Sequence, residues 1–118
     1  MTNPSSPACI PYLSSEEKRI FFSAAIAAVI AKGLTLIGQP IPHRHPKDLL
    51  GTLKAKQFDK QDQPLVDLVI VMLNPRAVTT LLEVRAFIKH AKETISKLEG
   101  NFEALQAIAK FEELSEGY

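Results

Sequence analysis

Two histidines separated by one residue are the feature of this sequence that comes closest to a chemical site. His43 and His45 lie in the segment 42–46, where a proline at each end favours an extended chain. Alternate residues of an extended segment share a face, so both imidazoles could reach one metal ion. Structural zinc takes four ligands, and Cys9 and His90 stand at no recognisable spacing from this pair. We therefore expect a solvated loop without a cofactor, with a metal site as the alternative.

No arrangement typical of an active site is visible. Nucleophilic catalysis needs a cysteine or serine beside a histidine and an orienting acid, and Cys9 lies in an irregular, proline-rich stretch. Gly33, Gly38 and Gly51 are too far apart for a glycine-rich phosphate loop. We assign no catalytic or cofactor-binding residue. A small enzyme or a metal-binding protein that uses the histidine loop is our third choice of function.

A group of basic residues could contact a phosphate backbone. Its members are Arg44, Lys47, Lys54, Lys56 and Lys60. Phe58 is the only aromatic residue near them, so base stacking is not indicated. The whole chain carries a formal net charge of only +1, and a solvated lysine face is the more usual explanation. Nucleic-acid binding is our second choice.

The composition is that of an ordinary globular domain. The chain has 118 residues, of which 46% are hydrophobic and 23% charged, which suits a single domain with its own core. One cysteine excludes an intrachain disulfide and suits a reducing compartment, so we predict a cytoplasmic protein. No apolar run reaches the roughly eighteen residues that span a bilayer, and we predict no membrane association.

The elements that must position these residues are predicted to be helices. We expect an irregular arm over residues 1–13 and one all-α domain over 14–118, built as a bundle of four or five helices. Ser14 and Glu17 form a capping-box pattern that starts a helix running to about Lys32, with Gly33 as its stop. Apart from Ser23, every position from 20 to 31 is apolar, which predicts a helix surrounded by protein. The same run after Lys18 and Arg19 could instead be a secretory signal, but it lies far from Met1 and follows two glutamates.

The longest helix is predicted from Pro75 to Leu98. Its apolar residues recur at alternating spacings of four and three: Ala77, Leu81, Val84, Ile88, Ala91, Ile95 and Leu98. Asn74 is the expected N-cap, with Pro75 at the first helical position and Gly100 after the end. The apolar surface of this helix and of the run 20–31 exceeds what a short bundle covers. We therefore predict a homodimer, with Leu81, Val84 and Ile88 as candidate interface residues.

The segment 65–73 is the ambiguous one. Its β-branched residues favour a strand, but only 34–37 could pair with it, and an isolated two-stranded sheet is improbable. We therefore predict a short buried helix that bends at Pro75 into the long one. An α+β domain with strands near 34–37 and 66–73 remains the alternative.

Two further helices complete the predicted bundle. One runs from Pro46 to about Gln57 and the other from Phe102 to about Leu114, where Leu105, Ile108, Ala109 and Phe111 would pack back on the long helix as an αα-hairpin. With much apolar helical surface and no site chemistry, the first choice of function is a non-catalytic protein–protein interaction module, such as a small adaptor, chaperone or regulatory subunit, with an unidentified protein partner.

Overall fold

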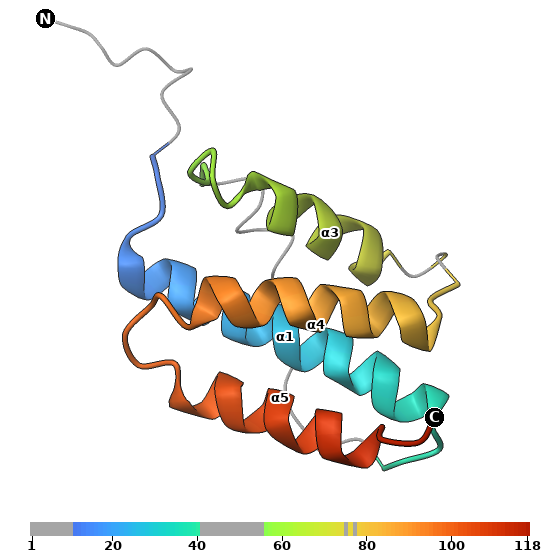
Figure 1. The fold of residues 1–118 in the computed structure, drawn as a ribbon. Coiled ribbons are helices and arrows are strands. Elements are labelled where there is room, and N and C mark those ends of the chain that lie inside the picture. Colours follow the sequence, from blue (N-terminus) through green and yellow to red (C-terminus); the bar gives the residue numbers. More distant parts are fainter. Residues whose placement is uncertain (1–10, 41–55, 75, 77) are drawn as a thin grey trace, which may run out of the picture.

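The computed structural model describes residues 11–40, 56–74, 76 and 78–118, and its regular secondary structure there is entirely helical. The helices are α1 (Ser15–Leu36), α3 (Gln63–Leu73), α4 (Leu81–Ile95) and α5 (Phe102–Leu114). α1 contacts the other three, and α4 crosses in front of it with α3 and α5 on opposite sides (Figure 1). The predicted all-α bundle is confirmed.

The apolar run of α1 lies at the centre of the bundle. Ser14 accepts a hydrogen bond from the Glu17 amide at 3.2 Å, and the Glu17 carboxylate accepts one from the Ser14 amide at 3.0 Å, so the predicted capping box is present. Phe22, Ala25 and Val29 are each at most 1% exposed. Because apolar side chains surround this helix, it is stable only with protein packed on several sides.

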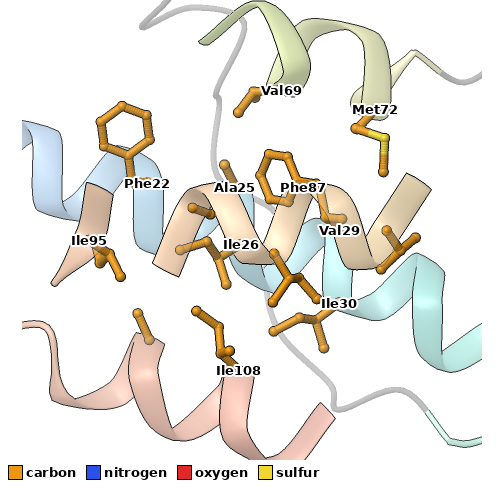
Figure 2. Close-up of a cluster of buried hydrophobic side chains, with 14 of the residues drawn as sticks. Phe22, Ala25, Ile26, Val29, Ile30, Val69, Met72, Phe87, Ile95 and Ile108 are labelled. Carbon is orange, nitrogen blue, oxygen red and sulfur yellow. The ribbon is translucent and has the colours of Figure 1, made fainter. Parts of the chain in front are cut away.

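The core is shared by all four of these helices (Figure 2). Its labelled side chains are Phe22, Ala25, Ile26, Val29 and Ile30 of α1, Val69 and Met72 of α3, Phe87 and Ile95 of α4, and Ile108 of α5. α3, α4 and α5 each pack part of their apolar face on α1, so α1 lies at the centre of the described helices.

The predicted end of α1 at Gly33 is wrong. The helix continues through Gly33 to Leu36, and the residue with a left-handed backbone is Gly38, at φ 73°. Glycine is required at position 33 because side chains of two other helices fill the space beside its Cα. A Cβ at this position would lie 2.5 Å from the ring of Phe111 and 2.9 Å from a methyl of Val84. The absent side chain allows α4 and α5 to approach the α1 backbone.

The long helix predicted from 75 to 98 is shorter at both ends. Asn74 is the C-cap of α3, with ψ 119°, because a residue that precedes proline is driven out of the helical region. Its side-chain oxygen accepts from the amide of Arg76, so it forms a turn instead of an N-cap. α4 begins only after Thr80, whose hydroxyl accepts from the Glu83 amide in a second capping box.

The segment 65–73 is a helix, as predicted, and the α+β alternative is wrong for the described residues. α3 buries Leu65, Val66, Val69 and Met72, with Pro64 in its first turn. Of the alternative strand 34–37, the first three residues are the last turn of α1. The chain does not bend at Pro75 into one long helix, because α3 ends at Leu73.

The predicted αα-hairpin of α4 and α5 is confirmed. Ile108 and Phe111 face the core, while Leu105 is half-buried and Ala109 is exposed. Gly100 turns the chain with φ 72°, and the side chain of Asn101 donates to the Ile95 carbonyl at 3.1 Å, which caps the end of α4.

Two predicted segments fall mostly outside the described residues. Of the arm 1–13, residues 11–13 are described, and Tyr12 forms an isolated parallel bridge with Gln57. Of the predicted helix 46–57, the described residues 56 and 57 are not helical.

Gly33→Ala is expected to destabilise the protein. Alanine is the better helix former by about 1 kcal/mol, but overpacking against a buried ring costs about 1–3 kcal/mol, and Phe111 is only 2% exposed. Urea unfolding followed by circular dichroism would measure a lower midpoint. Leu36→Ala, on the exposed side of the same helix end, is the control and should change little. Equal or greater stability of Gly33→Ala would contradict the packing argument.

Candidate functional site

Most residues of the predicted histidine and basic sites lie outside the described residues. These are His43, His45, Arg44, Lys47 and Lys54. Lys56 is half-buried and forms an ion pair with Glu17 at 3.4 Å, whereas Lys60 is exposed. Of these two described lysines, Lys56 is held in an ion pair within the chain, whereas Lys60 is exposed to solvent.

The candidate interface residues of α4 are mostly in the core. Val84 and Ile88 are 0% and 3% exposed, and Leu81 is half-buried against the same core. Their four-and-three spacing marks the inward face of α4 within its own bundle. The predicted dimer therefore loses Val84 and Ile88 as surface residues, because α1 and α5 already cover this side of the helix.

A metal-binding cluster is also absent from the part of the chain that the structure describes. No three His, Cys, Asp or Glu side chains converge there. His90 is half-buried on α4, and its carbonyl accepts from the Thr94 hydroxyl within the helix.

Five exposed aliphatic side chains follow one another from α3 into α4, and we call them the aliphatic set. They are Leu68, Ile70, Val71, Val78 and Leu82. Val78 is 91% exposed and Leu82 77%, so these two are almost fully in water. Leu68 and Val71 are three residues apart and share one side of α3. The sequence signal was the apolar character of both segments, which exceeds what one inward face requires.

A groove of about 440 Å³ lies between α4 and α5, and we call it the charged groove. Its α4 wall carries Arg85, Lys89 and Lys92, at positions i, i+4 and i+7, which places them in one row. Its opposite wall carries Glu112 and Glu116. A basic wall thus faces an acidic wall across a floor that includes two buried core residues.

Two contacts already cross the charged groove. Lys92 and Glu112 form an ion pair at 3.3 Å, with both side chains 51% exposed. The guanidinium of Arg85 donates to the Ser115 carbonyl at 2.6 Å, and Ser115 is the C-cap residue of α5. Arg85 therefore caps a helix end, while Lys89 and Glu116 have no side-chain partner among the described residues.

Two lysines of α1 hold both ends of α3. Lys18, 14% exposed, pairs with Asp59 and lies 3.1 Å from Asp62, the N-cap residue of α3. The hydrogen bond to Asp59 and the attraction of both carboxylates raise the pKa of Lys18, against a smaller opposing effect of burial. At the other end, Lys32 donates to the Met72 carbonyl, where the helix dipole favours a cation.

Membrane-spanning length is found in one described helix. α1 is long and apolar enough to cross a bilayer by length and composition, and it lies near the N-terminus. In this structure 44% of its most apolar window is buried in the bundle.

The comparisons of this chain with protein-family models, with curated proteins and with solved structures find no match.

Ile88→Asp is expected to unfold the protein. An unpaired carboxylate at a 3% exposed position costs several kcal/mol, a large part of the stability of a small domain. Circular dichroism would show a loss of helix at room temperature. Lys89→Asp, at the next and exposed position, is the matched control. A folded Ile88→Asp protein would contradict the assignment of this face to the core.

Lys18→Gln is expected to lower the free energy of unfolding by about 1–2 kcal/mol at neutral pH, because it removes a largely buried cation from two carboxylates. The folded pKa lies above the ordinary value of 10.5. The stabilisation is therefore present below that value and is lost as the pH rises through the raised pKa. Denaturant unfolding of both proteins from neutral to strongly alkaline pH would show the difference shrinking, and a constant difference would argue against the ion pair. Lys60→Gln is the exposed control.

Proposed function

We propose that this chain is a non-catalytic helical protein–protein interaction module, such as a small adaptor, chaperone or regulatory subunit. The observation that carries the proposal is the aliphatic set, above all Val78 at 91% and Leu82 at 77% exposure. The five side chains are exposed within one stretch of the chain, and contiguous exposed apolar surface is typical of contact sites for other proteins. The cytoplasmic location stays a prediction from the sequence.

The energetics indicate the kind of contact. Burying a valine or leucine side chain fully contributes about 1.5–3 kcal/mol, so Val78 and Leu82 together could supply about 3–6 kcal/mol. Association itself costs about 4–15 kcal/mol in lost translational and rotational freedom. A partner must therefore also cover the α3 members of the set, and we propose a partner with an apolar surface wide enough to span both segments.

Nucleic-acid binding and enzymatic action receive less support. Among the predicted basic residues that the structure describes, Lys56 is paired with Glu17, which leaves Lys60 as the exposed one. Arg44, Lys47 and Lys54 lie outside the described residues, so within the part that the structure describes a phosphate contact is supported by Lys60 alone. The described residues also contain no cluster of three His, Cys, Asp or Glu side chains that could hold a metal ion.

Val78→Ser with Leu82→Ser is expected to weaken binding of the partner while the fold is kept, because both side chains are exposed. Tagged wild-type and variant proteins would be used to capture partners from the native cell, with quantification by mass spectrometry. We expect at least one protein to be recovered about tenfold less with the variant, which corresponds to about 1.4 kcal/mol of binding free energy.

The matched control replaces two apolar residues that are exposed elsewhere. Leu36→Ser with Phe102→Ser changes side chains that are 48% and 69% exposed at the ends of α1 and α5. This control should recover the same proteins as the wild type. If no protein distinguishes the variant from the control, the proposal fails. Salt-sensitive recovery of nucleic acid that is lost with Lys60→Gln would favour the second function instead.

A further inference from the structure

We infer that a second copy of this chain docks on the charged groove, with a two-fold axis parallel to the groove. This inference does not rest on the proposed function, because it uses the α4–α5 side of the bundle and not the aliphatic set. It replaces the predicted interface at Val84 and Ile88, which the core of the chain already occupies.

The first step is the sign of the charges. A ligand of one sign, such as a phosphate or an acidic peptide, would be attracted by one wall of the groove and repelled by the other. The basic wall holds Arg85, Lys89 and Lys92, and the acidic wall holds Glu112 and Glu116. The fitting partner presents a row of each sign, side by side and with the same spacing. A second copy of the groove has this arrangement.

The second step is the symmetry. Rotation by 180° about an axis along the groove exchanges the two walls and leaves each residue at the same level along the groove. The basic wall of one copy, which holds Lys89, then faces the acidic wall of the second copy, which holds Glu116. The two walls meet at the same height along the groove as they do within one chain. A two-fold axis perpendicular to the groove would instead place the basic wall of one copy against the basic wall of the other, with lysine facing lysine. The charge pattern therefore selects one of the two closed pairings.

The third step is the direction of the helices. α4 and α5 are antiparallel in the hairpin, as Figure 1 shows. Rotation about an axis parallel to the groove does not reverse the direction of a helix. α4 of one copy therefore lies over α5 of the other and runs antiparallel to it. Each helix of the resulting four-helix arrangement has antiparallel neighbours, which places opposite ends of the helix dipoles together.

The fourth step concerns the charged side chains of the groove that have no partner within one chain. Lys92 and Glu112 already pair across the groove at 3.3 Å, and Arg85 caps α5. Lys89 and Glu116 line the same groove and have no side-chain partner within the described residues. In the docked pair each of them gains an opposite charge from the second copy, and no contact within either chain has to break.

Charge reversal tests the inference directly. Sedimentation equilibrium of the wild type at low salt should show a monomer–dimer equilibrium that weakens as salt is added, since exposed charges are screened. Lys89→Glu alone and Glu116→Lys alone should each weaken dimerisation about tenfold, because each change occurs twice in a symmetric pair. The double variant, with both reversals in one chain, restores opposite charges across the two-fold axis and should recover the wild-type dissociation constant.

The control reverses two charges outside the groove. Lys97→Glu and Glu103→Lys are exposed positions beside the α4–α5 link and should leave dimerisation unchanged. Circular dichroism would confirm that every variant keeps its helical content. A wild type that stays monomeric at high micromolar concentration would overturn the inference. So would a double variant that folds but does not regain dimerisation, or a dimer that is lost with Val78→Ser and Leu82→Ser instead.

Discussion

The structure depends on the burial of one helix that has apolar side chains on all sides. α1 cannot satisfy its surface with a single neighbour, so α3, α4 and α5 each pack one apolar face against it. α4 and α5 are amphipathic helices whose far sides are mostly polar, whereas the far side of α3 carries the exposed Leu68, Ile70 and Val71. Their arrangement follows from the central helix: where α1 offers room, as at Gly33, a neighbour comes close.

The sequence predicts those features of the fold that depend on short-range rules. The capping box of Ser14 and Glu17 is a local arrangement of four residues, and it forms as the pattern indicates. The pattern of Thr80 and Glu83 is of the same kind and marks the true start of α4. The sequence prediction begins this helix at Pro75 instead, because proline is also compatible with a helix start and the apolar period extends backwards through the non-helical link.

Features that depend on distant parts of the chain could not be predicted. Gly33 looks like a helix stop, since glycine is common after helix ends, but its role is set by Phe111, which is 78 positions further along the chain. The same limit applies to the surfaces. The row of Arg85, Lys89 and Lys92 is visible in the sequence, whereas the acidic wall opposite it exists only once the α4–α5 hairpin has formed.

The two lysines of α1 also determine which lengths of this helix are compatible with the fold. A uniformly apolar cylinder has no preferred rotation, and many rotations would bury similar surface, which is the condition for competing packed states. Lys18 and Lys32 remove that freedom, because they stand about four turns apart on nearly the same side and grip opposite ends of α3. Insertion or deletion of one residue between them would rotate one lysine by about 100° around the axis of α1 and break its contact with α3. Exchange of one aliphatic residue of α1 for another leaves both lysine contacts with α3 in place. The length of α1 between the two lysines is therefore more tightly constrained than its composition.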